Sequence, residues 1–291
     1  MHIIENDQLR VAVSDHGAEL TGIFDKKNNR EVIWNADPAY WKRHAPVLFP
    51  NVGRYYEDHC LIGGKTYTSG QHGFARDMEF ICTEETENSV THLLEATEET
   101  KKIWPYAFQL YITHTLNDRD LTVTWKVVNN DQETMCFTIG GHPAFNVPVI
   151  PGTVRDDYYL TFSGQKELKY HLINPAYGTA IPEETYTLAL EDGKCKIDAH
   201  MFDKDALNFD EGQITKAGIA LPDGTPYLEM SCDGFPNFGI WSAGNAPFVC
   251  LEPWMGRWDN TGYDKDLSQK PNINILKPAE VFDKSYTISI K

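Results

Sequence analysis

Apolar and polar residues alternate along much of this chain with a period of two, the repeat of a strand that buries one face. In the run LTVTWKVV at 121–128, the odd positions are apolar and most even positions are polar. The run AFQLYITHTL at 107–116 alternates in the same way, and NDRD at 117–120 has the composition of a tight turn. These two runs predict an antiparallel hairpin.

Similar pairs of runs recur along the chain. Hairpins are predicted over 9–25, 60–68 and 78–97, with their turns near 15–17, 63–64 and 87–88. Further short strand-like runs lie at 154–162, 226–232, 238–243, 248–253 and 285–290. Many short strands with regular turns indicate an antiparallel sandwich or barrel.

Helical patterns are few and short. A helix is predicted at 37–43, with Asp37 as N-cap and Pro38 at the first helical position, and a single turn at 199–207. A parallel α/β fold is disfavoured because crossover helices are missing. We therefore expect an all-β fold, a large antiparallel β-sandwich with a few short helices, as a single domain over residues 1–291.

The overall charge narrows the classes of partner. The 291 residues include 26 Lys and Arg against 42 Asp and Glu, a formal net charge of −16. Such a surface repels nucleic acid and anionic membranes, so neither is expected as a partner. The first residues lack the pattern of a signal peptide, and no apolar run approaches the ~20 residues that cross a bilayer. The expected location is the cytoplasm.

The cysteines indicate neither a disulfide framework nor a metal finger. No pair has C-x-x-C spacing, and most lie in apolar, strand-like runs. A chain of this length can bury a core without cross-links, so we expect free, buried thiols in a reducing compartment. The six are Cys60, Cys82, Cys136, Cys195, Cys232 and Cys250.

Two apolar segments each contain one titratable residue. IGGHPAFNVP at 139–148 holds His142, and APFVCLEPWMGRWD at 246–259 holds Glu252. An ionised carboxylate in so apolar a strand is either paired or functional. A structural pairing of Glu252 with Arg257 has about an even chance, and a lone histidine is more often a hydrogen-bonded structural residue. Pro143 cannot donate to a ladder, so we expect the strand to end or bulge there.

Two loop-like segments add basic side chains. FPNVGRYYEDH at 49–59 contains Arg54, and SGQHGFARDMEF at 69–80 contains His72 and Arg76. Each is weak by itself, because a solvated turn with Arg76 paired to a neighbouring acid explains it equally well. Aromatic residues cluster near these motifs and could stack on a sugar, although core packing is favoured about two to one for each. They are Tyr55, Tyr56, Trp241, Trp254 and Trp258.

Taken together, four motifs resemble the aldose 1-epimerase (galactose mutarotase) family, in particular its shorter bacterial mutarotase-related branch. They are GR at 53–54, QHGFARD at 71–77, GGHPAFNVP at 140–148 and CLEPW at 250–254. They follow the family order, and the resemblance covers nearly the whole chain. GGHPAFN and LEPW are the specific pieces, whereas HGFAR is shared with the hexose-6-phosphate 1-epimerase branch.

The resemblance implies a β-supersandwich with a sugar cleft across one sheet. The family's catalytic histidine and glutamate fall on His142 and Glu252. Its substrate-binding arginine and second histidine fall on Arg54 and His72. An aspartate that holds sugar hydroxyls matches Asp205 on a looser motif. Arg76 matches a position that contacts the substrate or its phosphate in some members, and the larger mutarotases differ around it.

The chemistry of mutarotation suits these residue types. A base removes the proton of the C1 hydroxyl, an acid protonates the ring oxygen, and the open-chain aldehyde rotates and closes on its other face. No metal or other cofactor is needed. The ordinary pKa values of glutamate and histidine, near ~4.3 and ~6.5, bracket a window in which Glu252 is the base and His142 the acid. Asp205 would keep His142 charged, and Gly140 and Gly141 would make room for the sugar.

The leading hypothesis is a cofactor-free aldose 1-epimerase that acts on a free aldohexose, as a monomer or homodimer. One alternative is a hexose-6-phosphate 1-epimerase, in which Arg54 and Arg76 hold the phosphate, aided by Lys42 or Arg43. Another is a sugar-binding protein without catalysis. The sequence does not give the preferred sugar or its pathway.

Overall fold

The alternating runs form antiparallel sheets in a computed structural model that describes residues 1–291. The predicted hairpin at 107–128 forms from β10 and β11. The two strands pair antiparallel, from Phe108 opposite Asn129 to Asn117 opposite Asp120. The hairpins predicted over 9–25, 60–68 and 78–97 form as well. The expectation of an all-β antiparallel sandwich is therefore confirmed.

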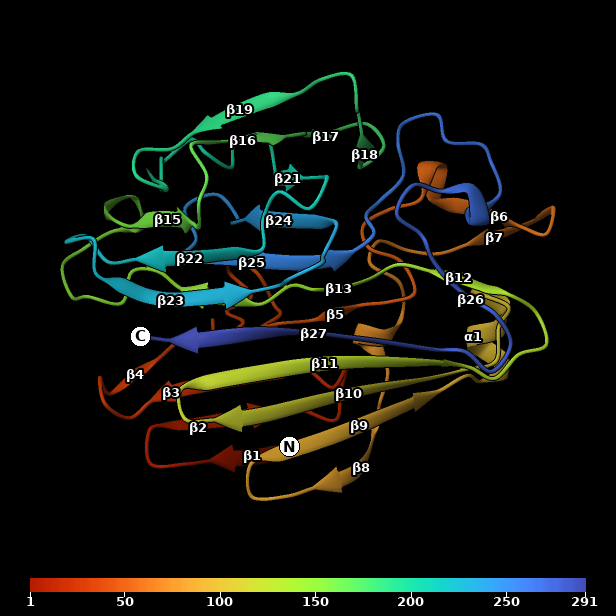
Figure 1. Ribbon diagram of the computed structural model, residues 1–291, viewed down its shortest axis with the longest axis horizontal. Coiled ribbons are helices and arrows are strands. Elements are labelled where there is room, and N and C mark those ends of the chain that lie inside the picture. The colour runs from red at the N-terminus through yellow and green to blue at the C-terminus, as the bar shows by residue number, and fades with distance from the viewer.

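The largest sheet has nine strands, and Figure 1 looks onto them as they run across the molecule. In spatial order they are β20 (Lys194–Lys196), β15 (Tyr159–Phe162), β22 (Lys216–Ala220), β23 (Pro226–Ser231), β27 (Val281–Ile290), β11 (Asp120–Asn129), β10 (Phe108–Asn117), β9 (Ser89–Glu95) and β8 (Ile81–Glu85).

Two further sheets complete the main framework. A four-stranded sheet is formed by β1 (His2–Glu5), β2 (Leu9–Val13), β3 (Leu20–Asp25) and β4 (Arg30–Glu31). A six-stranded sheet is formed by β21 (Leu207–Phe209), β24 (Asn237–Trp241), β25 (Phe248–Met255), β13 (Ile139–Gly141) and β5 (Val47–Leu48), with β14 (Ala144–Asn146) also paired to β25.

Short elements cover the ends of these sheets. Four strand pairs are β6 (His59–Ile62) with β7 (Lys65–Thr68), β12 (Met135–Phe137) with β26 (Asn274–Leu276), β16 (Glu167–Tyr170) with β19 (Tyr186–Ala189), and β17 (Ile173–Asn174) with β18 (Thr179–Ala180). The helical elements are α1 (Glu98–Ile103) and four 3₁₀ turns at Tyr56–Asp58, Ala75–Asp77, Arg155–Asp157 and Leu267–Gln269. No helix has the length and apolar character needed to span a bilayer.

The two predicted helical segments form turns instead of helices. At 37–43, Asp37 accepts a hydrogen bond from the Ala39 amide at 2.9 Å, but the helix stops after one turn. There the Trp41 ring packs against Trp241 and Phe248, so tertiary contacts override local propensity. At 199–207 the chain makes successive turns. The α-helix that does form, α1, was not predicted.

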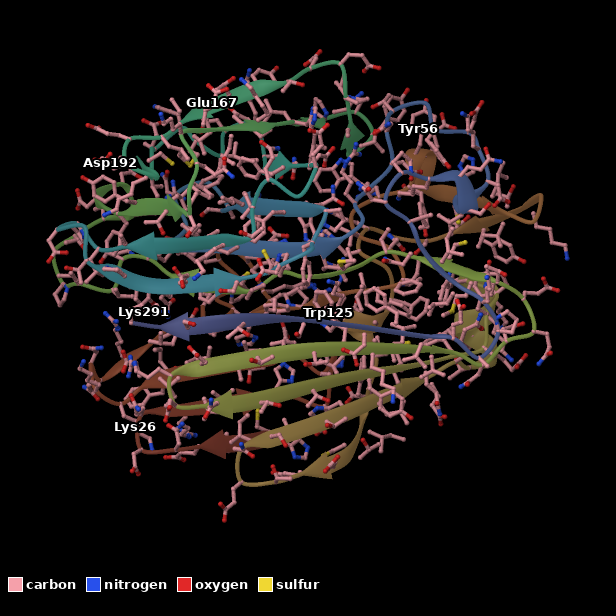
Figure 2. The ribbon with its side chains drawn as sticks, in the orientation of Figure 1. Lys26, Tyr56, Trp125, Glu167, Asp192 and Lys291 are labelled. Atoms are coloured by element: carbon pink, nitrogen blue, oxygen red, sulfur yellow. The ribbon has the colours of Figure 1, made fainter.

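One apolar core joins the three main sheets. It contains 54 buried residues, among them Val11 of β2, Leu110 of β10 and Leu251 of β25. Figure 2 shows Trp125 in the interior and the charged residues Lys26, Glu167 and Asp192 near the periphery. The six cysteines are all unpaired, as expected; four are buried as expected, whereas Cys82 and Cys195 are half-buried. The core packs one face of the six-stranded sheet and leaves the other face free to carry polar groups.

Candidate active site

Strand register brings His142 and Glu252 together. In the pairing of β13 with β25, Gly140 lies opposite Trp254. Four residues later, β14 pairs with the same strand β25 in the same register, with Ala144 opposite Cys250. Extending either register by two residues places His142 opposite Glu252. His142 Nε2 lies 3.2 Å from Glu252 Oε2. Pro143 lies in the gap between β13 and β14, so the expected interruption of the ladder is present.

Alternation along the strands turns this pair away from the main core. Leu251 and Phe145 point into the core, whereas His142 and Glu252 lie on the opposite face of the six-stranded sheet. Both are buried, with exposures of 7% and 2%. Two small apolar clusters lie on the same face. We name them the Trp34 cluster (Trp34, Ala144, Ala246, Phe248 and Cys250) and the Trp254 cluster (Leu48, Val52, Ala180, Trp254 and Trp258).

The two glycines before His142 do not make room for a ligand, so that expectation is wrong. A Cβ on Gly140 would lie 2.4 Å from Cδ1 of Trp254, and a Cβ on Gly141 would lie 2.9 Å from the Tyr286 hydroxyl oxygen. The protein's own aromatic side chains fill both spaces. The glycines therefore allow close packing beneath the site.

The expected charge states of the pair are also corrected. Burial raises the pKa of Glu252 well above its usual range, and the charge of Asp205 raises it further. Burial lowers the pKa of His142 to about 3, and the nearby Arg76 and Arg43 also lower it. Asp205 therefore acts on the glutamate and does not keep the histidine charged. Both shifts favour a carboxylic acid beside a neutral imidazole, a state in which the two groups hold one dissociable proton between them.

The structural alternative for Glu252 does not hold. Arg257 Nε instead pairs with Asp210 Oδ2 at 2.9 Å. Cys250, two residues before Glu252, places its thiol within 4.8 Å of the carboxylate and of a ring nitrogen of His142. Burial raises the pKa of the Cys250 thiol well above its usual value. A metal ion here would have to displace protons from two groups that burial keeps protonated, so the donor set suits proton transfer better than metal binding.

His72 lies beside this pair with one tautomer selected. Its ring is edge-on to that of His142, with centroids 5.7 Å apart. The Gly53 amide donates to His72 Nδ1 at 3.0 Å, so the ring proton of the neutral imidazole belongs on Nε2. Burial lowers the pKa of His72 well below its usual range, and His142 lowers it further. The Nε2–H group is thus a neutral donor close to His142, and it faces the side-chain amide of Gln71 at 3.3 Å.

Arg54 is held by its neighbours and keeps an exposed fraction of 39%. Its Nη1 donates to Asp58 Oδ1 at 2.8 Å. Its stem packs on Gly178, where a Cβ would lie 2.7 Å from Arg54 Cδ. The Asp259 amide donates to the Arg54 carbonyl at 3.1 Å and fixes the backbone. Arg54 contributes to the lowered pKa of His72, as expected for a cation facing the same region.

Arg76 and Arg43 are two further cations near His142. Arg76 Nη2 donates to the Gln71 carbonyl at 2.6 Å, and its Nε lies 3.8 Å from Asp77 Oδ2. Arg43 Nη2 bonds the same carboxylate at 2.8 Å. Burial lowers the pKa of Arg76 to about 10, and the charge of Arg43 lowers it further. The expected pairing of Arg76 with Asp77 is thus present as a long contact, without excluding a second role.

Asp205 forms no hydrogen bond or ion pair with His142 or Glu252, and only its charge acts on the glutamate. It is exposed, has a positive φ of 75°, and its Oδ1 accepts a hydrogen bond from the next amide at 2.7 Å. It borders a hollow of about 540 Å³ that also includes Ile173 and Tyr186. Ile173 packs against the Trp254 cluster, and the charge of Asp205 reaches Glu252. This hollow therefore adjoins the face that carries the pair.

Aromatic rings surround His142, but only one was expected. Trp241 lies edge-on at 5.6 Å between centroids. Trp41, which the sequence placed in a helix, lies at 4.8 Å and is tilted by 30°. Trp254 and Tyr55 are core residues with exposures of 1% and 2%. No strand pattern marks Trp41, and its place between a one-turn segment and Arg43 gave no signal for a contact with His142.

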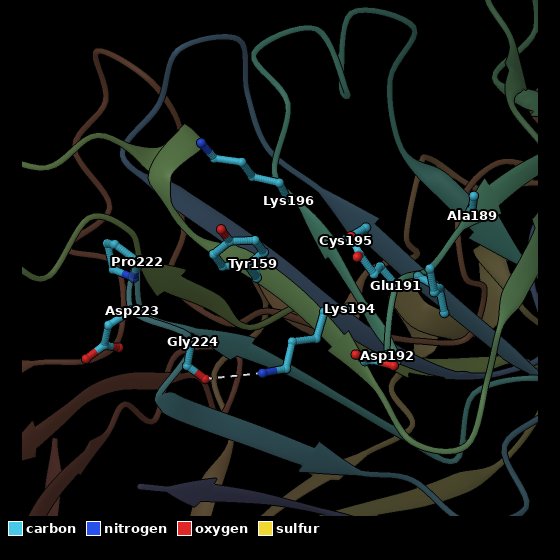
Figure 3. Close-up of a pocket in the computed structure, with 11 residues that line it drawn as sticks. Tyr159, Ala189, Glu191, Asp192, Lys194, Cys195, Lys196, Pro222, Asp223 and Gly224 are labelled. Carbon is cyan, nitrogen blue, oxygen red and sulfur yellow. Dashed lines mark hydrogen bonds between the residues drawn. The ribbon is translucent and has the colours of Figure 1, made fainter.

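Another surface hollow lies away from this pair. It has a volume of about 770 Å³ and lies between β15, β20 and the turn after β22 (Figure 3). Its polar groups are lysines and acids, including the half-buried Lys194, whose Nζ donates to the Gly224 carbonyl at 3.3 Å. It contains neither His142 nor Glu252. The chemistry for proton transfer is on the six-stranded sheet.

Comparisons with known proteins agree with the fold and the motifs. The family model for aldose 1-epimerase matches residues 1–195. The chromosomal protein LacX of Lactococcus lactis subsp. lactis is 32% identical over 294 residues, which cover 99% of this chain and 98% of that protein. A galactose mutarotase related enzyme from Lactobacillus acidophilus is 33% identical, with a TM-score of 0.94 over 100% of this chain and 97% of the other.

A galactose mutarotase-like protein from Lactobacillus casei is 29% identical, with a TM-score of 0.91 and full coverage of both chains. Fold and sequence identity thus extend over the whole length of the chain. The chain belongs to the aldose 1-epimerase family.

Proposed function

We propose that this protein interconverts the α and β anomers of an aldohexose, with His142 and Glu252 as its acid–base pair. The observation that carries this proposal is the 3.2 Å contact between two buried titratable side chains on the outer face of the six-stranded sheet. A buried acid and base that share one proton are suited to moving a proton within a bound molecule.

The geometry fits the reacting atoms of a cyclic sugar. The C1 hydroxyl and the ring oxygen are bonded to one carbon, so partners that lie side by side can serve both. Glu252 as carboxylate takes the hydroxyl proton while protonated His142 gives a proton to the ring oxygen. The C1–O5 bond then breaks, the aldehyde rotates, and reversal of both transfers closes the other face.

Transfer of the shared proton from Glu252 to His142 prepares this reactive form. The neutral pair and the ion pair contain the same number of protons, so no exchange with solvent is needed. Burial favours the neutral pair in the free protein. Hydroxyl groups of a bound sugar supply hydrogen bonds that favour the charged form, because a hydrogen bond to a charged group is stronger than one to a neutral group.

The surrounding side chains have positioning roles in this proposal. His72 donates from Nε2 to a sugar hydroxyl, and Arg54 donates from the guanidinium N–H groups that are not bonded to Asp58. Asp205 accepts from a hydroxyl at the edge of the adjoining hollow. Trp41 and Trp241 offer apolar faces to the sugar C–H groups. The contacts that support these roles are the tautomer of His72 and the fastened backbone of Arg54.

The test is polarimetry on freshly dissolved α-anomers of several aldoses. We expect the protein to speed equilibration of at least one of them. The variants Glu252→Gln and His142→Asn should each lower the rate by about 10²–10⁴-fold, the usual contribution of a positioned acid or base. An equilibration rate that the protein leaves unchanged for every sugar and its 6-phosphate would contradict the proposal.

The cations near His142 favour a second candidate, a 1-epimerase acting on a hexose 6-phosphate. Arg43 and Arg76 both contact Asp77, and a phosphate could bind the same two guanidinium groups. Comparing kcat/KM for glucose and glucose 6-phosphate separates the two. If the phosphate matters, Arg76→Ala raises KM for the phosphorylated sugar only; if it does not, both substrates respond alike.

A further inference from the structure

A second group of metal-ligating side chains lies outside the proposed active site, where the edges of two sheets meet. β1 is the edge strand of the four-stranded sheet, and β8 is the edge strand of the nine-stranded sheet. β1 contacts β9, and Figure 1 shows the three strands beside one another. A ring nitrogen of His2, the thiol sulfur of Cys82 and a ring nitrogen of His92 lie within 4.8 Å of one another.

A bulge in β8 orients the side chains of this group. Cys82 lies directly opposite His92, so both side chains point to the same face of the sheet. The register then shifts between Cys82 and Glu84, which leaves Glu85 opposite Val90. Since Val90 and His92 share a face, the bulge also brings Glu85 onto it, three residues after Cys82. Bulges commonly redirect side chains in this way.

His92 is a buried imidazole that lacks hydrogen-bond partners. Its residue exposure is 0%, and neither ring nitrogen makes a hydrogen bond. Its Nε2 nevertheless lies 3.3 Å from Asp15 Oδ1. Native proteins rarely leave a buried ring nitrogen without a partner. A cation among these atoms would supply one.

His2 is oriented as metal-binding histidines usually are. Its Nδ1 lies 2.8 Å from Glu85 Oε2, and its Nε2 lies 2.9 Å from Asp15 Oδ1. A histidine ligand commonly donates one ring N–H to a carboxylate, as His2 Nδ1 does to Glu85, and the Nε2–H that bonds Asp15 would give up its proton to bind the metal. The second oxygen of Asp15, Oδ2, accepts a hydrogen bond from the Met1 amine at 3.0 Å. Both imidazoles thus direct Nε2 toward Asp15 Oδ1.

We propose that His2, Cys82, His92 and Asp15 bind one divalent cation of the zinc class, which ties the N-terminal strand to the edge of the nine-stranded sheet. Two imidazoles, a thiolate and a carboxylate are the ligand types that zinc takes in tetrahedral sites. In such a site, ligand atoms are separated by about 3.3–3.7 Å, as the metal–ligand bond lengths require. Of the two contacts to Asp15 Oδ1, the 3.3 Å contact from His92 Nε2 has this spacing, whereas the 2.9 Å contact from His2 Nε2 is a hydrogen bond that a metal would replace.

The site is structural in this account. Its ligands come from β1, from the turn after β2, and from β8 and β9, so the cation closes a chain segment of about 80 residues or more, which restricts the unfolded chain. Binding forms one metal–sulfur bond and releases two protons to solvent, the thiol proton of Cys82 and the Nε2 proton that His2 donates to Asp15. Asp15 is partly exposed and provides the route of entry.

The test uses the untagged full chain, freed of metal by a chelator and titrated with Co²⁺ and then Zn²⁺. We expect one Co²⁺ per chain with the thiolate charge-transfer absorption and the strong visible bands of four-coordinate cobalt, and loss of both on adding Zn²⁺. Zinc at 100 times its Kd should raise Tm by roughly 4 °C.

Matched variants place the metal. Cys82→Ser and Asp15→Asn should lose the charge-transfer band or weaken binding at least tenfold, whereas Cys195→Ser, a change at another half-buried thiol, should leave the spectrum unchanged. Absence of cobalt binding overturns the proposal. So does a band that survives in Cys82→Ser and disappears in Cys250→Ser, because that result assigns the metal to the thiol beside His142. The outcome does not depend on whether the protein is an epimerase.

Discussion

At the scale of single residues, environment changes the charge of the proposed catalytic pair. The sequence identified His142 and Glu252 through their motifs, and their ordinary pKa values suggested an ion pair near neutral pH. Burial on a sheet face reverses that assignment and favours the uncharged forms. The sequence could not show this, because burial of both groups depends on strands 110 positions apart.

A pH profile tests these charge states. The pair gains a second proton only as pH falls to about 3, the lowered pKa of His142. It loses its single proton only above the raised pKa of Glu252. The value of kcat/KM, which reports the free enzyme, should therefore show no protonation step as pH falls from 7 to about 5. A fall in kcat/KM centred near the ordinary histidine value of ~6.5 would mean that the groups titrate independently.

Trp41 should support His142 in catalysis. Its ring lies against the imidazole at 4.8 Å and also contacts Trp241. We expect Trp41→Ala to lower kcat/KM by about tenfold, since the lost aromatic contacts are worth about 0.5–1.5 kcal/mol each. Steady-state polarimetry gives the value, and Tyr40→Ala is the matched control, because Tyr40 is an exposed neighbour. Equal effects in the two variants would show that Trp41 has no particular role.

At the scale of elements, local sequence patterns predicted where strands lie, but they did not predict which distant strands pair with one another. Period-two alternation located the β10–β11 hairpin. Pro143, which has no backbone N–H, located the break between β13 and β14. The pattern did not reveal that β13 and β14 share one register against β25. Pairing across more than 100 residues depends on the tertiary fold, as does the fate of the expected helix at 37–43.

The glycine before the pair offers a test of packing under the site. Because Trp254 fills the space beside Gly140, Gly140→Ala should force the indole to move and lower the free energy of unfolding by about 1–3 kcal/mol. Gly70→Ala is the control, since a Cβ there meets no atom within 4 Å. Urea unfolding gives both values. A neutral Gly140→Ala would restore the earlier interpretation that this space is open for a ligand.

At the scale of the whole molecule, the strands of both chain ends meet in one framework. β27 pairs with β11 and with β23, and it thereby joins the two halves of the nine-stranded sheet. We propose that residues 1–291 form one domain, for which the shared core is the support. The net charge of −16 did not predict the arginines near His142, because a total charge contains no positions.

An ion pair links the four-stranded sheet to the nine-stranded sheet, and its contribution to the stability of the protein can be measured. Asp25 of β3 is 0% exposed and lies 3.0 Å from Arg119 Nη2, while Arg119 Nε donates to the Ile290 carbonyl at 2.9 Å. Arg119→Leu removes one of two cations from the Asp25 carboxylate, which keeps Arg30 Nε at 3.5 Å, and should cost about 1.5–3 kcal/mol of unfolding free energy, the usual value of a hydrogen bond to a charged group. Arg10→Leu, at an exposed position of β2, should change it by less than about 0.5 kcal/mol. Similar losses in both variants would contradict a structural role for the Asp25–Arg119 pair.

The central claim is that His142 and Glu252 catalyse anomer exchange, and the most direct measurement is the exchange rate itself. Magnetisation transfer between the anomeric protons of an equilibrated aldohexose gives that rate by NMR, without a net reaction. We predict that the wild-type protein and Glu167→Gln, a change at an exposed glutamate of β16, accelerate exchange equally. Glu252→Gln should slow it by at least about 10²-fold while remaining folded. Full exchange in Glu252→Gln would contradict the account.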